Sequence, residues 1–565
     1  MKISKQLLVT ILALVFILSL AGCAQPAPAP APVPIPVPAP GPAPAPEPVP
    51  TPSPAPAPTG PYGELRIAVT TLGAQRFDPI KSDLTGMGMN LYQMYDLLFW
   101  WEKGEGRPML AERWEVGKDG LSWTFYIRKG VKFHNGADLT AADVKFSLER
   151  HMSPQALQPP EAIRDIERVE MVDDYTVRVY TKSLQPFMPF YLSQTSSTVL
   201  VTPKSYIEQR GVEYFETHPV GSGPFRLARQ VSGDISEYEA LDKHWGRTAD
   251  FRKLSIILIP EETTQAALLR TGGVDLTNVG LETAEILETA GFKVQPYLWQ
   301  NGSVHFFGAY EARGKGMPTQ DIRVRKALSL AINRKAIIDG LYKGRARPPF
   351  VGDLVESSTD IDVAYWYDYF AKANPYDPAE AKRLLKEAGY PDGFKIKMYA
   401  TKSSGRAFIP QWAEIIQGYW REVGVIAELN TIEHGTYTTW RRHPVNIALV
   451  GNALMYGNPE RPGRSVALQL TSYASDTSST RLLDGANIAG LDELINAAQS
   501  EMDAGKRKEM AAKVLKTSVD TYVMYQIAQV PAMVVYSPRL SLDTWPSAPA
   551  NSYTPTYAYS IKHAK

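Results

Sequence analysis

The residue types most often used for catalysis and metal binding are scattered through this chain of 565 residues. No two histidines have the spacing of a metal-ligating helix or loop, and no Gly-x-Ser-x-Gly elbow presents a nucleophilic serine. We therefore expect a protein that is not an enzyme and that has no metal site and no cofactor. A hydrolase assembled from distant residues is the alternative. The eight histidines stand at positions 134, 151, 218, 244, 305, 434, 443 and 563.

Cys23 is the only cysteine, so the chain can form no internal disulfide and no Cys-based metal or redox site. It follows two early lysines and an apolar run, residues 7–20, that is short for a membrane span. Leu-Ala-Gly-Cys at 20–23 looks like a bacterial lipobox, whose cysteine is acylated. We predict a lipoprotein signal peptide at 1–23, with Cys23 as the lipidation site. The alternative is a chance cysteine behind a signal peptide that is cleaved elsewhere.

Proline occupies every even position from Pro26 to Pro58. Such a tract cannot pair in a sheet or continue a helix, which predicts an extended polyproline II linker over 24–60. At roughly 3.1 Å per residue the tract would reach on the order of 100 Å, enough to hold a globular body away from a membrane. A ligand for proline-binding modules is the other interpretation.

The remaining body, residues 61–565, has balanced charge. The chain contains 60 Lys+Arg and 59 Asp+Glu, and the first 60 residues hold two of the former and one of the latter, which leaves 58 of each sign. No basic field indicates a nucleic acid as partner. A body of this length is too large for one simple core, so two or three lobes are expected.

The most informative pattern lies at residues 110–150. Apolar and polar residues alternate through 121–127, which predicts a strand, and again at 131–133, which predicts a second short strand. Thr140 and Asp143 then have the spacing of helix-capping residues. The segment is expected to form a strand pair that leads into a capped helix.

Hydrophobic spacing predicts further elements along the body. We expect a first strand at 64–70, a helix from about 87 to 101 and a buried strand at 254–259. Asp377 followed by Pro378 predicts the start of a capped helix, and a wide apolar face predicts another helix over 412–423.

Residues 110–150 resemble the signature of the bacterial family 5 extracellular solute-binding proteins, the dipeptide-, oligopeptide- and nickel-binding components of ABC importers. The matching residues are Leu-Ala-Glu-x-Trp at 110–114, Asp-Gly through His-x-Gly at 119–136, and Thr-Ala-x-Asp-Val at 140–144. Pro-Val-Gly-Ser-Gly-Pro-Phe at 219–225 is also similar to a segment of that family. A phosphate loop is rejected there because no Lys-Ser or Lys-Thr follows.

The resemblance implies an α/β, two-lobed periplasmic-binding-protein-like fold, type II, of the large class with an extra small domain. Ligand would bind in the cleft between the lobes, which close on it by a hinge. The expected segments are a signal peptide with lipobox at 1–23, a Pro-rich extended linker at 24–60, lobe I (first segment) at 61–95, the small extra domain with the family signature at 96–215, lobe I (second segment) at 216–303, lobe II at 304–525 and lobe I (C-terminal segment) at 526–565.

Aromatic residues are frequent where members of this family turn side chains toward the cleft. Such rings can stack on a sugar or clamp a planar ligand, and ordinary core packing is the competing explanation for each. Arg441 could bind a carboxylate through two hydrogen bonds, or could belong to a solvated basic turn. The candidate ligand-binding residues are Trp299, Phe307, Tyr399, Trp440, Arg441, Asn452, Met455, Tyr456 and Asn458.

One departure from the family concerns the ligand directly. Its peptide binders carry Ala-Asp-Tyr followed closely by Pro, and that aspartate grips the ammonium group of the peptide; here Met455 stands in its place. An apolar side chain cannot offset a desolvated ammonium, so recognition of a free peptide N-terminus is not expected at this residue. A one-residue slip in the alignment is the alternative, and Asn452 or Asn458 could still accept a hydrogen bond.

The resemblance implies an extracytoplasmic substrate-binding lipoprotein, anchored to the cell membrane at the cell surface or in the periplasm. It would capture a peptide or peptide-like solute and deliver it to an ABC permease and ATPase complex. The same role with an oligosaccharide or other small solute is the first alternative. An exported hydrolase or a chaperone-like module on this fold is the second. We expect a monomer with no nucleic acid partner.

Overall fold

The described part of the chain begins at the last residue of the predicted linker. The signal peptide, Cys23 and residues 24–59 of the linker lie outside the described residues, and so does Arg441. The chain divides into two units, Met1–Ala57 and Pro58–Lys565, and every described element belongs to the second. The computed structural model describes residues 60–82, 88, 90–102, 105–157, 161–194, 199–310, 312–351, 354, 361–402, 406, 408–440, 446–459, 466, 488, 490–542 and 558–564.

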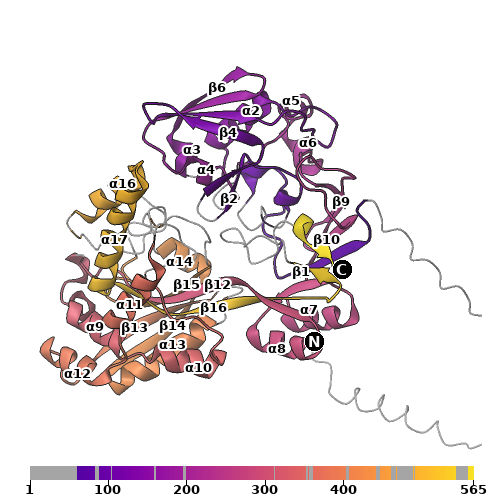
Figure 1. The fold of residues 1–565 in the computed structure, drawn as a ribbon. Helices are drawn as coiled ribbons and strands as arrows, with labels where there is room; N and C mark the ends of the chain where they lie inside the picture. The colour runs from indigo at the N-terminus through magenta and orange to yellow at the C-terminus, as the bar shows by residue number, and fades with distance from the viewer. Residues whose placement is uncertain are drawn as a thin grey trace, which may run out of the picture. The chain divides into compact units, whose positions relative to one another are not determined.

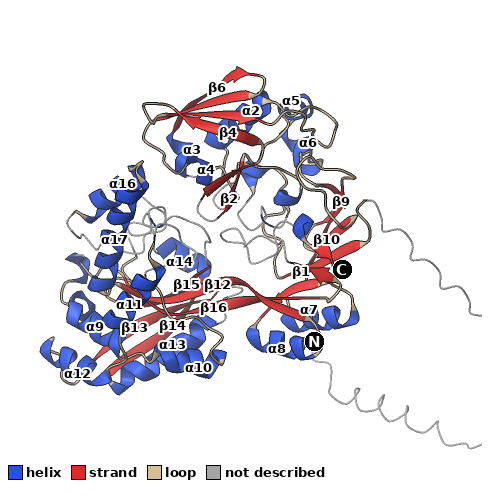
Figure 2. Cartoon of the chain, in the orientation of Figure 1, coloured by secondary structure: helices blue, strands red, loops and turns tan. Residues whose placement is uncertain are grey.

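A mixed sheet of ten strands is the framework of this unit (Figures 1 and 2). Parallel pairs lie on both sides of an antiparallel centre. The predicted strands at 64–70 and 254–259 are confirmed as parallel neighbours in it. Its strand order is β14 (Val425–Glu433), β13 (Phe394–Lys402), β15 (Ala453–Pro459), β12 (Lys293–Phe306), β16 (Met524–Tyr536), β11 (Leu276–Val279), β1 (Glu64–Val69), β10 (Lys253–Leu258), β9 (Ile235–Ala240) and β8 (Phe225–Val231).

The long strands β12 and β16 run antiparallel through the middle of the sheet. Their pairing has two irregularities, one at Pro296 and one at Gly302. Proline lacks the N–H that a ladder needs, and an irregularity of this kind bends and twists a strand. The predicted limits of lobe II, after 303 and after 525, fall inside these two strands, and those limits stay predictions.

Helices cover both faces of the sheet at its β13–β15 end. In Figure 1, α13 and α10 lie on one face and α14 lies on the other. The α-helices are α2 (Ala141–Met152), α3 (Glu161–Asp165), α4 (Met188–Tyr191), α5 (Lys204–Arg210), α6 (Val212–Thr217), α7 (Glu262–Thr271), α8 (Leu281–Thr289), α9 (Ile322–Leu330), α10 (Arg334–Tyr342), α11 (Val363–Ala373), α12 (Pro378–Glu387), α13 (Phe408–Glu422), α14 (His434–Trp440), α16 (Leu491–Ser500) and α17 (Ala504–Thr521).

The predicted caps and helices at three places are confirmed. The Asp143 carboxylate accepts a hydrogen bond from the Thr140 N–H at 2.9 Å, at the start of α2. The Asp377 carboxylate accepts from the Glu380 N–H at 2.9 Å, at the start of α12. Each satisfies a backbone amide that has no partner inside its helix. The helix expected over 412–423 is α13.

A second, four-stranded sheet contains the family signature. Its order is β4 (Ala111–Val116), β5 (Ser122–Ile127), β7 (Thr176–Thr181) and β6 (Ile166–Asp173). The strand predicted at 121–127 is confirmed, but its expected pairing with 131–133 is wrong. Both edges of β5 are already occupied, by β4 and β7. Val131 and Phe133 are instead buried in the core beneath this sheet.

The helix predicted from about 87 to 101 is also wrong for its described residues. Leu91–Gln93 forms one turn of 3₁₀ helix, and β2 (Phe99–Glu102) pairs with β3 (Glu105–Pro108). Residues 90–99 are all buried. Because this segment is enclosed on every side, its apolar residues mark no single face, and their spacing does not distinguish a helix from other structure.

Candidate functional site

Four of the candidate aromatic residues gather on one face of the ten-stranded sheet, together with Tyr437. We call Phe307, Tyr399, Tyr437, Trp440 and Tyr456 the aromatic cluster. The tyrosines of β13 and β15 keep 7% and 5% of their surface exposed, and Trp440 is half-buried. The rim of the cluster that solvent can reach is therefore formed by these three rings.

Strand alternation explains why these rings meet. Tyr399 on β13 is paired with Leu454 on β15, and Tyr456 follows two residues later on the same face. Tyr437 and Trp440 are three residues apart on α14, which places both on the helix side that covers these strands. The cluster thus combines two adjacent strands, the end of β12 and one short helix.

The rings make specific contacts. Tyr399 and Trp440 meet edge to face, with ring centroids 5.6 Å apart and planes at 86°. Tyr437 and Tyr456 are closer, at 4.3 Å and 32°. Edge-to-face and tilted pairs are the favoured geometries for aromatic rings. The phenol groups add hydrogen-bonding capacity to an otherwise apolar surface, which suits a ligand with both apolar and polar parts.

Three nitrogen-containing side chains lie beside Tyr456. The Arg406 guanidinium carbon is 5.4 Å from the centre of the Tyr456 ring. The rings of His305 and His434 are each 6.2 Å from the same ring. Arg406 and His305 are buried. The Arg406 guanidinium provides a positive charge beside the aromatic surface.

Met455 does not belong to this face. It is fully buried in the large core that contains α9, α12 and α13, beside Val304, while its neighbour Tyr456 points into the aromatic cluster. Since successive side chains of a strand point to opposite faces, Met455 and Tyr456 cannot both contact a ligand on one face. Met455 therefore lies on the opposite face of the sheet from the aromatic cluster.

Asn452 has a structural role. Its amide oxygen accepts a hydrogen bond from the Lys397 N–H at 3.1 Å, and its amide nitrogen donates to the Ala448 carbonyl at 3.0 Å. These bonds attach the turn before β15 to β13. Both the oxygen and the nitrogen of the Asn452 amide are engaged in structural hydrogen bonds and do not contact the aromatic cluster.

Two further candidates, Trp299 and Asn458, are not members of the aromatic cluster. Trp299 lies eight residues before Phe307, and the Arg347 guanidinium carbon is 3.8 Å from its ring centre. Asn458 belongs to β15, where its backbone pairs with Asn301. The structure describes nothing of the Asn458 side chain.

Tyr437, His305, His434 and Arg406 were absent from the sequence-based candidates. The spacing of His434, Tyr437 and Trp440 on one helical face is a signal that could have grouped these three residues. His305 shares a strand face with the paired residue Leu454, but the pairing of β12 with β15 has no local sequence signal. Arg406 follows β13 without any recognisable motif.

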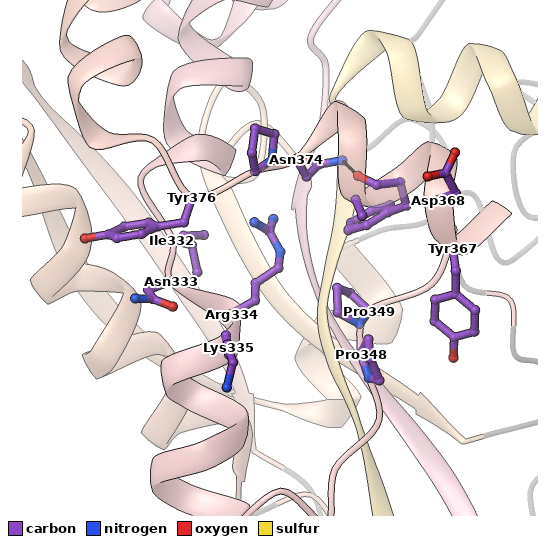
Figure 3. Close-up of a pocket in the computed structure, with 13 residues that line it drawn as sticks. Ile332, Asn333, Arg334, Lys335, Pro348, Pro349, Tyr367, Asp368, Asn374 and Tyr376 are labelled. Carbon is purple, nitrogen blue, oxygen red and sulfur yellow. Dashed lines mark hydrogen bonds between the residues drawn. The ribbon is translucent and has the colours of Figure 1, made fainter. Parts of the chain in front are cut away.

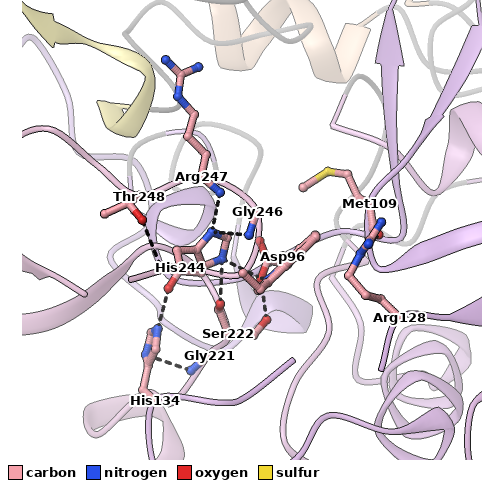
Figure 4. Close-up of polar contacts among 12 residues, drawn as sticks. Asp96, Met109, Arg128, His134, Gly221, Ser222, His244, Gly246, Arg247 and Thr248 are labelled. Atoms are coloured by element: carbon pink, nitrogen blue, oxygen red, sulfur yellow. Dashed lines mark hydrogen bonds and ion pairs between the residues drawn. The ribbon is translucent and has the colours of Figure 1, made fainter. Parts of the chain in front are cut away.

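A second polar arrangement brings serine, histidine and aspartate together (Figure 4). The buried Asp96 carboxylate accepts hydrogen bonds from Ser222 Oγ and from Trp245 Nε1, both at 2.8 Å. The same carboxylate oxygen is 3.4 Å from His244 Nε2. The His244 Nδ1 atom accepts from the backbone N–H of Arg247 at 3.0 Å.

This arrangement is not that of a catalytic triad. A triad requires the serine hydroxyl to donate to histidine, but Ser222 donates to the carboxylate. Both nitrogens of His244 are engaged, and Ser222 is 1% exposed. The network instead joins residues 96, 222 and 244–248. Within the described ranges, no group of three or more His, Cys, Asp or Glu side chains could hold a metal ion.

The segment 219–225 packs closely on the same region. The Gly223 N–H donates to the Met94 carbonyl oxygen at 2.7 Å, and a Cβ atom at Gly221 would lie 2.0 Å from that oxygen. Glycine is required there because no side chain fits between the two backbones. This explains the glycines of the family motif without a bound phosphate.

A family model for bacterial extracellular solute-binding proteins, family 5 Middle, matches residues 105–466, which is more than half of the chain. Heme-binding protein A of Haemophilus influenzae is 30% identical, over 62% of this chain and 67% of that protein. The dipeptide-binding protein of Escherichia coli is 30% identical, over 58% of this chain and 64% of that protein. The matched part therefore spans about two thirds of the length of these relatives.

The fold is similar to that of solved binding proteins. The ABC transporter-associated periplasmic binding protein DppA from Helicobacter pylori, in complex with the peptide STSA, matches with a TM-score of 0.70 at 22% identity. The match covers 90% of this chain and 99% of that chain. The predicted α/β fold of the periplasmic-binding-protein type is confirmed.

Proposed function

Because the chain belongs to the bacterial extracellular solute-binding proteins of family 5, we propose that it captures a peptide or peptide-like solute outside the cytoplasm. It then delivers this solute to an ABC permease and its ATPase. The observation that carries the proposal is the aromatic cluster on the sheet face at β13 and β15. The dipeptide-binding relative and the peptide complex of the structural neighbour support a peptide as the default ligand.

The chemistry beside the cluster favours a ligand with an anionic group. Arg406 supplies a positive charge next to Tyr456. Planar guanidinium groups bind carboxylates through two parallel hydrogen bonds. We infer that a peptide would be held through a carboxylate and through ring contacts, and not through its free N-terminus.

A non-peptide solute is the second candidate for the same transport role. Tyrosine and tryptophan rings can stack on an oligosaccharide or a flat organic ligand. A relative at 30% identity is a heme-binding protein, which shows that members similar to this chain differ in ligand. In either case we propose that the protein makes and breaks no bond, consistent with the geometry around Ser222.

We propose that the protein is located outside the cytoplasm and is anchored to the membrane by a lipid at Cys23. We also propose that it is a monomer. Among the described residues no helix is long and apolar enough to cross a membrane. The anchor proposal depends on the lipobox at 20–23, which lies outside the described residues.

The ligand class can be tested by native mass spectrometry of the purified protein after incubation with peptide and oligosaccharide libraries. Recovery of an intact ligand at one copy per protein is the expected result. N-terminally acetylated peptides should bind as well as free ones, whereas amidation of the C-terminus should weaken binding at least tenfold. Released hydrolysis products would overturn the transport role, and a strict need for a free N-terminus would overturn the carboxylate model.

The site itself can be tested with Tyr456→Ala. Loss of one buried ring contact should weaken ligand binding about fivefold, since such contacts contribute roughly 1 kcal/mol to an aromatic site. Tyr214→Ala is the matched control, because Tyr214 is exposed on α6. Equal affinity of both variants, measured by calorimetry, would place the ligand elsewhere.

A further inference from the structure

A pocket of about 640 Å³ lies between the start of α10, the end of α11 and the chain at 348–349. Figure 3 shows it with its lining side chains. The floor contains buried residues and the opening is bordered by exposed ones. The buried lining residues are Ile332, Arg334, Phe370 and Asn374, and Tyr376, Pro375, Pro348, Asp368 and Ala371 are among the exposed ones.

Arg334 is the unusual member of the floor because it is a buried cation. It is 7% exposed, and its Nε donates to the Gln526 carbonyl at 2.9 Å. One N–H of Nη1 donates to the Ser329 carbonyl at 3.0 Å, and one N–H of Nη2 donates to Ser329 Oγ at 2.8 Å. Each terminal nitrogen carries a second hydrogen, for which the described residues offer no acceptor.

No carboxylate of the described residues forms an ion pair with Arg334. Asp368, at the far rim, pairs with Lys372 at 2.6 Å. Lys335 points away from the guanidinium (Figure 3). Burial lowers the pKa of Arg334 to about 10, so the group is still charged at neutral pH. The rings of Phe370 and Tyr525, whose centres lie 5.7 and 5.3 Å from the guanidinium carbon, offset part of the cost of burying this charge. A bound anion would supply the counter-charge that the described residues do not provide.

The walls determine what kind of anion fits. Ile332, Phe370 and the prolines at 348, 349 and 375 form a largely apolar surface. A small inorganic anion would leave this surface in contact with water, and a neutral apolar molecule would leave the guanidinium without a counter-charge. A pocket of this volume is in the range of small-molecule sites.

We propose that this pocket binds a monocarboxylate whose acid group is carried on a small apolar chain or ring. The carboxylate would accept a hydrogen bond from one of the remaining N–H groups of Arg334, and the apolar part would contact Ile332, Phe370 and the prolines. The site is distinct from the aromatic cluster, which lies on the sheet face covered by α14, and it does not depend on the transported solute.

Octanoate is the probe. Octanol is the comparison that has the apolar chain but no charge, and inorganic phosphate is the comparison that has charge but no apolar chain. Titration of the purified protein, followed by calorimetry, should give one octanoate per protein. Octanol should bind at least tenfold more weakly, and phosphate should not displace octanoate. Equal binding of octanol and octanoate, displacement by phosphate, or no binding of octanoate would each overturn the proposal.

Variants locate the binding. Ala371→Trp places a bulky ring at the exposed edge of the pocket and should reduce octanoate affinity at least tenfold without loss of folding. Ala364→Trp is its control, since Ala364 is exposed on the same helix and does not line the pocket. Tyr456→Ala should leave octanoate binding unchanged, so failure of this proposal and failure of the proposed transport site are separable. Unaltered affinity in Ala371→Trp would contradict the assignment.

Discussion

Arg325 and Arg334 show how single cations are accommodated inside this protein. The Arg325 guanidinium donates to the carbonyl groups of Thr319 and Thr521, at 2.7 and 2.9 Å, and to the Tyr310 hydroxyl at 2.9 Å. Burial lowers the pKa of both arginines, and backbone carbonyls partly replace the lost water. Both arginines use all three nitrogens on structural partners among the described residues, but Arg325 donates four hydrogen bonds and Arg334 donates three.

The stability of the protein should fall at mildly acidic pH because of His134. Its Nε2 donates to the Gly223 carbonyl at 2.9 Å, and its Nδ1 accepts from the Gly221 N–H at 3.3 Å. Burial lowers the pKa of His134 below the value of about 6.5 for an unfolded histidine. The unfolded state therefore binds more protons, so the stabilisation is complete above pH 6.5 and is lost as the pH falls below it.

The measurement is the thermal midpoint of the wild type and of His134→Gln between pH 7.5 and 5.5. Glutamine can donate to the Gly223 carbonyl but does not titrate, so its midpoint should decrease less across this range. The difference between the two proteins isolates His134 from other titrating groups. Parallel curves would show that protonation of His134 does not control stability.

The residues of the aromatic cluster were only partly predictable. Phe307, Tyr399, Trp440 and Tyr456 were chosen because of the family resemblance, and the structure brings them together. The sequence did not predict toward which face of the sheet the Met455 side chain points, because this depends on the register of β15 against β12 and β13. Register is fixed by contacts between segments more than fifty residues apart, which a local pattern does not report.

At the scale of elements, α13 packs on β12 through a glycine. A Cβ atom at Gly302 would lie 2.4 Å from Cζ3 of Trp412, which is fully buried. Gly302→Ala should therefore destabilise the protein by about 1–3 kcal/mol, the usual cost of overpacking a core. The change can be measured as a lower midpoint of urea unfolding.

Gly418→Ala is the matched control for this contact. Gly418 lies in the interior of α13, and a Cβ atom there would meet no atom within 4 Å. Alanine is favoured over glycine in a helix interior by about 1 kcal/mol, so this variant should raise the midpoint. A similar effect of both substitutions would indicate that helix propensity, and not the contact with β12, determines the result.

Element predictions succeeded where local chemistry decides the structure. The caps at Thr140 and Asp377 are examples, because a capping side chain acts on amides three residues away. The predicted pairing of residues 131–133 with β5 is wrong, because β5 pairs with β4 on one edge and with β7 on the other. Competition among strands for a limited number of edges is a property of the whole sheet, and the alternation of a short segment cannot reveal it.

At the scale of the whole molecule, one sheet joins several cores. The long strands β12 and β16 contribute residues to the core that contains α9, α12 and α13, and β16 also contributes Val534 to the core that contains β1 and β10. These strands connect the packed regions that the resemblance assigns to lobe I and lobe II. The irregularities at Pro296 and Gly302 are located where such a connection could bend.

The lipid anchor is a prediction about the whole molecule because Cys23 lies outside the described residues. Cys23→Ala should move the protein from the membrane fraction to the soluble extracytoplasmic fraction and abolish labelling by palmitate. Ser53→Ala, in the Pro-rich linker, is the control and should leave both unchanged. Ligand binding should be the same in all three proteins, since the aromatic cluster is built entirely from residues 307–456. Retention of Cys23→Ala on the membrane would mean that another feature of the chain, or a partner, holds it there.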